Sequence, residues 1–490
     1  MKLCLKGHEY KFAVEQIMLA MFPGEKPEYT YNFEKDGRSA CISLKKGGIF
    51  STVYVIIAFD GKCGRGFARI KTKSLEMEED RLAQRLIKTA FYKAAVTIKG
   101  QKPVWGCLTG VRPCKILEKM VDEGSTQTAA IGRLQREYFV APEKAQLCGM
   151  ALDACLKVKR ELDKKDIALY IGIPFCPTRC AYCSFVSQSV EKSTGYIEPF
   201  LHCLYSEIEA AARAAAQCGL NVISVYFGGG TPTTLSENQL DELLDKLYAE
   251  FDLTCVKDFT VEAGRPDTIT EGKLRVLKKY GVSRISVNPQ TMSDRVLNII
   301  GRYHTAADIV SAFEMARNVG IENINMDIIA GLPGDSVEGY RNTLDKVLEL
   351  DPENITVHTL SLKKGSRIMT ENMPIPGQGE VAEMLRLTSE KLSGSGYSPY
   401  YLYRQKYMSG GFENTGWAKP GTENLYNILI MEELCSIISM GGGASTKFVD
   451  MQTGKIQRIF NPKYPKEYIE GIDSVNEKKK SITDFYLNKE

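Results

Sequence analysis

Residues 170–183 have the sequence YIGIPFCPTRCAYC, an apolar, strand-like run that ends in three closely spaced cysteines. Cys176, Cys180 and Cys183 follow the spacing C-x3-C-x2-C, and Pro174 and Pro177 favour a loop around them. A loop of this kind can bring three thiolates to one metal centre. Because a [4Fe–4S] cluster usually takes four thiolates, three would leave one iron open to a small ligand.

A structural zinc site and a chance grouping of buried cysteines are the alternatives for this triplet. Zinc would require a fourth cysteine or histidine at ligand spacing. The nearest histidine, His202, falls inside a predicted helix among apolar residues. Most of the 14 cysteines stand singly in apolar segments and are expected to be small buried side chains. An iron–sulfur cluster with one open iron is therefore the favoured interpretation.

From residue 167 onward, short apolar strands alternate strictly with amphipathic helices. One of these helices opens at Ser236 with a capping box, which Gln239 completes three residues later. Strands joined by helical crossovers form parallel βαβ units, and six units are too few for a closed eight-fold barrel. We therefore predict an α/β chain with an incomplete (β/α)6 barrel. Its strands are expected at Ile167–Pro174, Val222–Phe227, Phe259–Ala263, Arg284–Val287, Ile324–Ile329 and Ile355–Leu360.

The barrel is expected to be one of four parts of the chain. Residues 1–105 mix strand-like runs with a long helix near 77–99, which indicates an N-terminal α+β accessory domain. Residues 106–165 form a predicted helical connector, and the barrel follows over 166–365. Residues 366–490 are expected to be a C-terminal mixed α/β region on the substrate side. Its strands are predicted at 398–408, 425–433 and 435–440, before a helical tail from residue 465.

Composition narrows the class of protein. The 490 residues are 43% hydrophobic and 25% charged, with a net charge of +3, which is typical of a soluble protein of two or three domains. The interspersed charges give no reason to expect binding to nucleic acid or to an anionic membrane. The N-terminus is too poor in apolar residues for a signal peptide, and no apolar run approaches the roughly 18 residues of a membrane span. We therefore expect a cytoplasmic protein whose cysteines stay reduced.

Polar or glycine-rich positions follow the ends of several predicted strands. The sequence GGGTP at 228–232 follows the second strand, where glycines let the backbone approach a ligand closely, although a tight turn would also need them. Glu262 ends the third strand, where a carboxylate faces the catalytic mouth of a βα barrel unless it is only an exposed loop acid. Gln290, Arg302 and Asp327 come at or after the fourth and fifth strands, and Arg302 could instead pair with a surface acid.

The cysteine triplet, with an aromatic residue before its third cysteine at the end of a first barrel strand, resembles the radical SAM superfamily. This resemblance implies that the open iron binds S-adenosylmethionine (SAM), whose reductive cleavage gives a 5′-deoxyadenosyl radical. The wider pattern, from Tyr170 to beyond Asp327, is similar to the oxygen-independent coproporphyrinogen III oxidase (coproporphyrinogen dehydrogenase) family. Segments 108–113, 401–406 and 441–447 resemble the HemZ-like branch of that family.

By position, the resemblance assigns cofactor contacts along the barrel. The cluster would be held by Cys176, Cys180 and Cys183. The first SAM molecule would contact Tyr170, Gly229, Gly230, Thr231 and Glu262. A second SAM molecule would contact Tyr182, Gln290, Arg302 and Asp327. No catalytic side chain beyond the cluster and the SAM site is implied.

The resemblance also implies a tetrapyrrole substrate. The expected reaction is the radical SAM oxidative decarboxylation of coproporphyrinogen III propionates to vinyl groups, which gives protoporphyrinogen IX in oxygen-independent haem biosynthesis. The hydrogen atom would leave the β-carbon of a propionate, followed by carbon dioxide and one electron. An electron donor such as flavodoxin or ferredoxin is the expected protein partner.

Two positions depart from the best-studied members of the family. Phe185 stands where they carry a further cysteine, and Gly172 stands where they carry a histidine. The Cys-Ser-Phe form at 183–185 is closer to relatives that act as haem chaperones. A haem-binding transfer protein without decarboxylase activity is therefore one alternative, and another SAM-dependent tetrapyrrole enzyme, such as a methyltransferase, is a second.

Histidines and cations in the second half of the chain are further candidates for contacts to a tetrapyrrole. With only four histidines in the chain, His304 and His358 are the candidate axial ligands for haem iron. Arg404, Lys406 and Lys419 are candidate partners for propionates, although solvated charges on an edge strand would explain them equally well.

Overall fold

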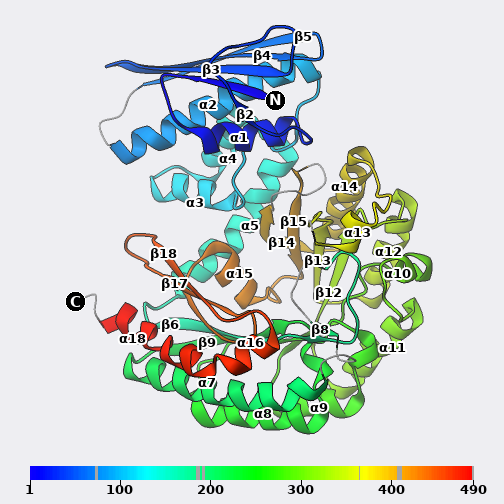
Figure 1. Cartoon of the computed structure of the whole chain (residues 1–490). Coiled ribbons are helices and arrows are strands. Elements are labelled where there is room, and N and C mark those ends of the chain that lie inside the picture. The colour runs from blue at the N-terminus through cyan, green and yellow to red at the C-terminus, as the bar shows by residue number, and fades with distance from the viewer. Residues whose placement is uncertain (72–75, 184–187, 190–193, 364, 405–410, 488–490) are drawn as a thin grey trace. The chain divides into compact units, whose positions relative to one another are not determined.

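The computed structural model describes all of the chain except residues 72–75, 184–187, 190–193, 364, 405–410 and 488–490 (Figure 1). Ser184, Phe185 and Lys406, on which part of the functional prediction depends, lie outside the described residues. The chain divides into two compact units, Met1–Gly149 and Met150–Glu490, and each is described by itself.

A five-stranded sheet in the order β2-β1-β3-β4-β5 forms the centre of the first unit. Its strands β3, β4 and β5 make an antiparallel meander, whereas β1 runs parallel to β2 and β3. Val53, Val55 and Ile57 alternate as the buried residues of β4, as expected of a strand with one face on a core. The strands are β1 (Lys2–Lys6), β2 (Glu28–Tyr29), β3 (Ser39–Lys46), β4 (Phe50–Phe59) and β5 (Lys62–Lys71).

Helices α1 (Lys11–Met21) and α2 (Glu76–Lys99) share an apolar core with this sheet. The backbones of α2 and β5 approach so closely that a Cβ atom at Gly66 would lie 1.8 Å from the carbonyl oxygen of Ala90, so this position requires glycine. The long helix predicted near 77–99 is confirmed by α2, and three helices follow in the segment expected to be helical. They are α3 (Cys114–Asp122), α4 (Gln127–Tyr138) and α5 (Pro142–Glu161).

Six parallel strands dominate the second unit, in the spatial order β6-β9-β10-β11-β12-β13. All six match strands expected from the sequence, which confirms the order of an incomplete (β/α)6 barrel. The two outermost of these strands pair with C-terminal strands and, among the described residues, not with each other. The strands are β6 (Asp166–Ile173), β9 (Asn221–Gly229), β10 (Asp258–Glu262), β11 (Arg284–Ser286), β12 (Asn323–Ala330) and β13 (Asn354–Thr359).

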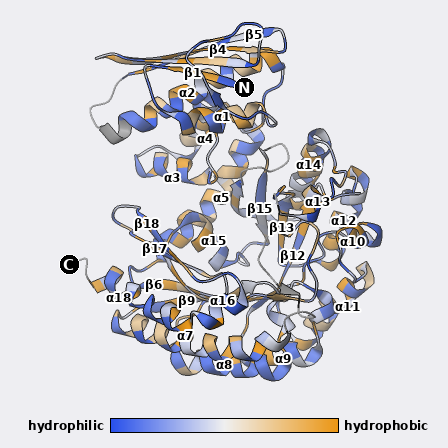
Figure 2. Ribbon diagram, viewed as in Figure 1, coloured by the Kyte–Doolittle hydropathy of each residue, from blue (hydrophilic) through white to orange (hydrophobic). Residues whose placement is uncertain are grey.

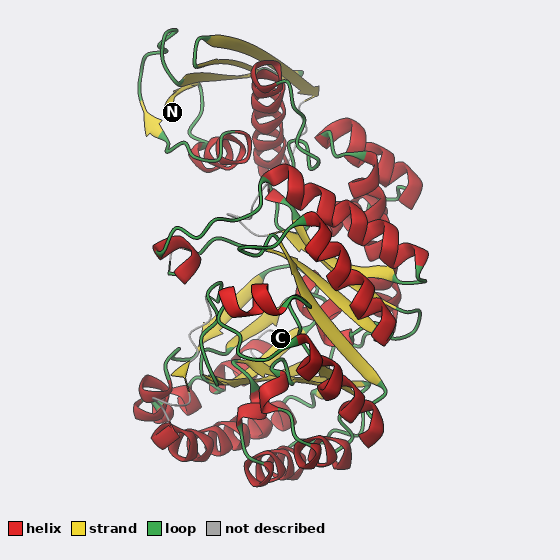
Figure 3. Ribbon diagram, turned by 90° about the vertical axis from the view of Figure 1, so that its right-hand side faces the viewer, coloured by secondary structure: helices red, strands yellow, loops and turns green. Residues whose placement is uncertain are grey.

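Helices connect each of these strands to the next and lie along the outside of the strand layer (Figures 1 and 3). In α8 the buried residues are Leu240, Leu243, Leu244 and Leu247, a spacing that places one apolar stripe toward the strands. Figure 2 shows the same mixture of apolar and polar residues along the neighbouring helices. The connecting helices are α7 (Ile197–Gln217), α8 (Glu237–Glu250), α9 (Glu271–Lys279), α10 (Asp294–Ile299), α11 (Ala306–Val319) and α12 (Val337–Leu350).

The C-terminal region extends the same sheet at both of its edges. β15 (Glu413–Ala418) runs antiparallel to β13 and pairs with β14 (Ser398–Arg404). At the other edge β16 (Ser436–Gly441) runs parallel to β6, followed by β17 (Ser445–Val449) and β18 (Ile456–Phe460). The result is an 11-stranded sheet.

The strand predicted over 425–433 is wrong, because this segment forms helix α15 (Leu425–Glu432). The Asn424 side chain caps the helix by accepting a hydrogen bond from the Asn427 N–H (2.8 Å). Tyr426, Ile428 and Leu429 are all buried, so the run is apolar almost without interruption. Periodicity alone does not separate such a buried helix from a buried strand.

The remaining elements include the expected helical tail. A short parallel pair, β7 (Phe175–Cys176) and β8 (Gln188–Ser189), follows β6. Further helices are α13 (Arg367–Thr370), α14 (Gln378–Gly394), α16 (Pro465–Glu470), α17 (Ile472–Glu477) and α18 (Lys480–Leu487). Single 3-10 turns occur at η1 (Thr194–Tyr196), η2 (Pro232–Thr234) and η3 (Pro266–Thr268).

Candidate functional site

The three predicted cluster cysteines lie on the loop that follows β6. Cys176 ends β7, and the Cys183 N–H donates a hydrogen bond to the Cys180 carbonyl (3.1 Å), which curls the loop. The Ala181 N–H donates to the Ile300 carbonyl (2.8 Å) and so fastens the loop to the segment after β11. The structure therefore places all three thiols on one anchored loop at the C-terminal ends of the parallel strands.

The GGGTP segment after β9 packs directly against this loop. The Thr231 N–H donates to the Phe175 carbonyl (2.7 Å), and the Thr231 hydroxyl lies 3.6 Å from Sγ of Cys176. A Cβ atom at Gly230 would lie 2.3 Å from the Phe175 carbonyl oxygen, so only glycine allows this approach. The segment predicted to hold a ligand is thus also what shapes the cysteine loop.

Cys180 is buried beside the guanidinium groups of two arginines. Burial alone would raise the pKa of its thiol, but the positive charges of Arg302 and Arg265 outweigh that effect and hold the pKa below its usual value. A lowered thiol pKa favours the thiolate, which is the form that binds metal. Arg265 was not among the residues predicted from the sequence.

Arg302, one of the predicted residues, is a buried side chain and not a surface partner of an acid. Its guanidinium donates to the hydroxyl of Tyr182 (3.3 Å) and to the backbone carbonyls of Asn288 (2.5 Å) and Gly264 (3.3 Å). The Asn288 side chain in turn accepts from the Asp327 N–H (3.2 Å). Asn288, which sequence reasoning missed, therefore connects Arg302 to Asp327.

Gln290 occupies a strained backbone position next to β12. Its φ is +64°, in the left-handed region that non-glycine residues rarely adopt. Two hydrogen bonds hold it there, from its N–H to the Asp327 carbonyl (2.9 Å) and from the Ile329 N–H to its own carbonyl (3.0 Å). Strain of this kind is characteristic of functional sites.

Two polar atoms of this group are buried without a hydrogen-bond partner in the described part of the chain. They are Oε1 of Gln290 and Nε of Arg302. Because buried polar groups are almost always paired in native proteins, these atoms indicate that a polar ligand completes the site.

Glu262 and Asp327 form a pair of carboxylates with opposite pKa shifts. Burial raises the pKa of Glu262 to about 7, although the Tyr226 hydroxyl donates to its Oε1 (2.6 Å) and opposes the rise. Burial also acts to raise the pKa of Asp327. Two neighbours outweigh it and lower that pKa: Nε2 of His358 lies 3.7 Å from Oδ2 of Asp327, and the Asn325 amide donates a hydrogen bond to Oδ1 (2.7 Å). At neutral pH Asp327 is therefore ionised, whereas Glu262 is poised between its two forms.

Three tyrosine rings stack next to Glu262. Tyr226 lies 4.4 Å from Tyr426 between ring centroids, and Tyr170 lies 6.2 Å from each of them. Tyr170 was predicted, whereas Tyr226 and Tyr426 were missed. Tyr426 was missed because its segment was assigned to a strand, and the apolar run after a capping asparagine was the signal that could have placed it on a helix.

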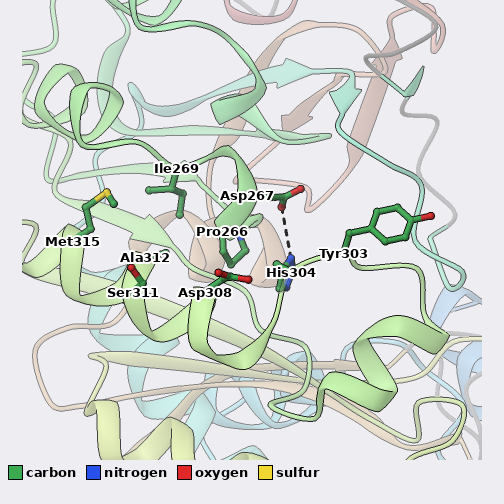
Figure 4. Close-up of a pocket in the computed structure, with 9 residues that line it drawn as sticks. All are labelled: Pro266, Asp267, Ile269, Tyr303, His304, Asp308, Ser311, Ala312 and Met315. Carbon is green, nitrogen blue, oxygen red and sulfur yellow. Dashed lines mark ion pairs between the residues drawn. The ribbon is translucent and has the colours of Figure 1, made fainter.

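The two candidate haem ligands lie in different places. His358, near the end of β13, faces Asp327 and so belongs to the site. His304 is buried, and its Nδ1 lies 3.6 Å from the Asp267 carboxylate in a pocket of about 280 Å³ between η3 and α11 (Figure 4). Among the described residues, both His304 ring nitrogens lack a hydrogen-bond partner.

The candidate propionate partners are also separated. Arg404 ends β14 at the same side of the sheet as the site, where it donates to the Gly411 carbonyl (2.8 Å). Lys419 lies at the opposite side, where it pairs with Asp351 (2.9 Å) before the start of β13. Of the two interpretations left open for Lys419, this position favours a surface ion pair, because antiparallel β15 carries its C-terminal end away from the mouth.

Taken together, these residues fit the predicted cofactors. Three thiols on one loop would leave a fourth ligand position open, and a glycine segment gives close backbone access. Among the described residues, buried polar atoms of Gln290 and Arg302 have no hydrogen-bond partner. Comparison with known proteins agrees with this interpretation. Residues 170–347 match the model of the radical SAM superfamily.

A relative with similar flanks decides the family. The oxygen-independent coproporphyrinogen-III oxidase-like protein HemZ of Bacillus subtilis (strain 168) is 42% identical over 381 residues, which cover 76% of each chain. The chain belongs to this oxygen-independent coproporphyrinogen-III oxidase-like family of radical SAM proteins. As a radical SAM protein of this oxidoreductase-like family, it uses a [4Fe–4S] cluster and SAM.

This radical SAM family also includes proteins with a different named role. The heme chaperone HemW of B. subtilis (strain 168) is 33% identical over 264 residues, or 53% of this chain and 65% of HemW. A solved structure of coproporphyrinogen III oxidase HemN from Escherichia coli, described as a radical SAM enzyme, matches with a TM-score of 0.52 and 22% identity over 66% of this chain and 73% of HemN. At that identity the match shows the fold. Among the described residues, no helix has the length and apolar character needed to cross a membrane.

Proposed function

We propose that the protein decarboxylates two propionates of coproporphyrinogen III to vinyl groups and so gives protoporphyrinogen IX. The observation that carries this proposal is the gathering of Tyr182, Gln290, Arg302 and Asp327 beside the cysteine loop, where two buried polar atoms have no hydrogen-bond partner among the described residues. The similarity to HemZ, which extends well beyond the superfamily domain, supports the tetrapyrrole substrate.

The proposed cofactor site has one part for the cluster and one for each SAM molecule. Cys176, Cys180 and Cys183 would hold the cluster, and the first SAM would lie along the GGGTP segment. Its contacts would be Tyr170, Gly229, Gly230, Thr231 and Glu262, and those of a second SAM would be Tyr182, Gln290, Arg302 and Asp327. When bound, the cluster and SAM supply the radical chemistry that removes a hydrogen atom from the substrate.

The chain's own residues bind and orient SAM and keep water away from it. Glu262 in its ionised form accepts hydrogen bonds from ribose hydroxyls, and Tyr226 fixes the carboxylate in place. The rings of Tyr170, Tyr226 and Tyr426 stack beside that carboxylate, and the Tyr226 hydroxyl donates a hydrogen bond to it. The electron donor is proposed to be a flavodoxin or ferredoxin, and the reaction is proposed to occur in the cytoplasm.

The test is anaerobic incubation of the protein, with its cluster reconstituted, with SAM, a reductant and coproporphyrinogen III. We expect vinyl product and 5′-deoxyadenosine in matched amounts, measured by chromatography and mass spectrometry. 5′-Deoxyadenosine without any change in the tetrapyrrole would overturn the proposed substrate. A methylated tetrapyrrole would instead indicate a methyltransferase.

A haem chaperone is the second candidate, favoured by the similarity to HemW and by His358 at the mouth of the site. A chaperone function predicts stoichiometric haem binding without turnover of coproporphyrinogen III. A shift of the haem absorption spectrum in His358→Gln, but not in a matched His202→Gln variant on helix α7, would support it. Turnover to protoporphyrinogen IX with no retained haem would exclude it.

A further inference from the structure

Arg265 is a buried arginine that the proposed reaction does not use. It lies three residues after the end of β10 and immediately before η3, and its side chain is only 4% exposed. A buried guanidinium needs a charged or polar partner at each of its edges. The contacts of Arg265 therefore indicate its role.

One edge of the guanidinium faces the cysteine loop. Nη1 lies 3.8 Å from Sγ of Cys180, and both Nη atoms lie 3.1 Å from the hydroxyl of Thr178. Thr178 stands between Cys176 and Cys180 in the sequence. Arg265 thus reaches the loop at the cysteine that is most deeply buried.

The other edge is clamped by a carboxylate. Nε and Nη2 each lie 3.0 Å from an oxygen of Asp267, a two-pronged arrangement that fixes the plane of the guanidinium. On its far side Asp267 faces His304, as Figure 4 shows. The countercharge therefore lies on the side of Arg265 away from Cys180, and the guanidinium stands between the two.

The geometry points to Arg265 as a positioning residue that sets the reduction potential of the cluster by holding a fixed positive charge against Sγ of Cys180. One electron passes from the reductant to the cluster, and the guanidinium exchanges no proton. Positive charge and N–H donors beside a cluster sulfur stabilise the reduced state, and they act strongly where water is excluded. Arg265 should therefore make the cluster easier to reduce.

Arg302 also lies beside Cys180, but its other contacts differ. It donates to Tyr182 and to two backbone carbonyls, and within the described residues its Nε has no hydrogen-bond partner. Arg265 has no such unpaired atom among the described residues, because its nitrogens point to Cys180, Thr178 and Asp267. The two arginines are thus separable by mutation, with Arg265 acting on the cluster alone.

The test measures a potential and not turnover. Full-length protein with its cluster reconstituted is titrated anaerobically against dithionite without SAM, and the reduced cluster is followed by electron paramagnetic resonance. We expect Arg265→Gln to lower the equilibrium constant for one-electron reduction about tenfold, which is a shift of about 59 mV to more negative potential. Arg265→Lys should lower the same equilibrium constant by about threefold, because lysine keeps the positive charge but loses the two-pronged geometry.

Arg275→Gln is the matched control, because Arg275 is a 71% exposed arginine paired with Glu271 on the neighbouring helix α9. Its potential should equal that of the parent. An unchanged potential in Arg265→Gln, at full iron and sulfide content, would overturn the inference. If that variant does not hold a cluster, Arg265→Lys decides, and an unchanged potential there overturns it equally.

The inference rests on the proposed ligation of the cluster by Cys180 and is independent of the tetrapyrrole. Loss of iron in Cys180→Ala tests the ligation, and the potential of Arg265→Gln tests the arginine. A protein that fails to decarboxylate coproporphyrinogen III but shows the expected shift would retain this role for Arg265 and lose only the proposed substrate.

Discussion

Buried arginines lie at both ends of the parallel strands, and their surroundings differ. At the N-terminal end, Arg284 uses every nitrogen of its guanidinium, on Asp258 (3.4 Å), on the side chain of Asn354 and on the Thr422 carbonyl (2.9 Å). At the C-terminal end, Nε of Arg302 beside Cys180 has no hydrogen-bond partner in the described part of the chain. A fully paired network makes a rigid base, whereas an incomplete one prepares a site for a ligand. The difference agrees with the general division of βα barrels between stability at one end and catalysis at the other.

The largest effect is expected at the C-terminal end, from Cys180→Ala. Removing this proposed ligand should abolish cluster assembly and the formation of 5′-deoxyadenosine from SAM, because the triplet offers three thiolates, already one fewer than the four that a [4Fe–4S] cluster usually takes. Iron content and chromatography of 5′-deoxyadenosine are the measurements. Cys255→Ala, which removes an exposed cysteine outside the triplet, should leave both unchanged. Normal formation of 5′-deoxyadenosine by Cys180→Ala would contradict the assignment of Cys180 as a cluster ligand.

At the N-terminal end, Arg284→Ala should damage stability. It leaves the buried Asp258, whose pKa burial already raises, without its cation, and we expect a loss of about 3–5 kcal/mol in the free energy of unfolding. Urea unfolding of the apoprotein measures this loss. Arg275→Ala should cost less than about 1 kcal/mol, since its ion pair is exposed. Equal losses for the two variants would contradict the contrast between the two ends.

A smaller effect is expected from Glu262→Gln, and it depends on pH. Because burial raises the pKa of Glu262 to about 7, the carboxylate that we propose to accept hydrogen bonds from ribose hydroxyls is lost as pH falls through 7, and SAM affinity should fall with it. Glu262→Gln should bind SAM about tenfold more weakly than the parent at about pH 8 and show no such pH dependence. Calorimetric titration at several pH values measures both.

The same shift has a consequence for the apoprotein. The folded chain holds the Glu262 proton more tightly than the unfolded chain, so the stability contributed by this group is present at low pH and is lost as pH rises through about 7. Glu262→Gln should therefore raise the Tm of the apoprotein above pH 7 relative to the parent. A lower Tm at that pH would contradict the raised pKa.

The smallest expected effect is that of Tyr226→Phe. The Tyr226 hydroxyl lowers the pKa of Glu262 by its hydrogen bond, so its removal should move the midpoint of the pH-dependent SAM affinity above 7. Tyr340→Phe removes a buried hydroxyl that bonds Thr388 and is the matched control, with no change of midpoint expected. A midpoint that moves to lower pH in Tyr226→Phe would contradict the role given to that hydroxyl.

The C-terminal ends of the strands were predictable from the sequence because parallel strands gather their ends at one mouth. Glu262, Gln290, Arg302 and Asp327 stand at or shortly after such ends. The structure connects Arg302 to Asp327 through the carbonyl and side chain of Asn288, and Gln290 to Asp327 by a backbone hydrogen bond. The six strands themselves were predictable because each is a short apolar run between amphipathic helices.

Other parts of the site could not be predicted, for physical reasons. The direction of the Tyr226 side chain depends on how β9 lies in the sheet, and Arg265 is distinguished only by contacts with Thr178 and Cys180, which are distant in the sequence. The end of the sheet at which Lys419 lies could not be predicted, because the direction of β15 is fixed by its antiparallel pairing and not by local sequence. The helix around Tyr426 was mistaken for a strand because its residues are apolar almost without interruption, which hides the helical period.

The C-terminal region, which supplies strands to both edges of the sheet, also sets the order in which the protein can be completed during synthesis. β6 finds its partner β16 only after the whole barrel has been translated, and β13 waits for β15. Until then the nascent barrel exposes the unpaired backbones of two strands, a surface on which chains aggregate. A ribosome that pauses before residue 436 would therefore hold a barrel with one edge still open, and chaperones would be expected to bind the nascent chain at that stage.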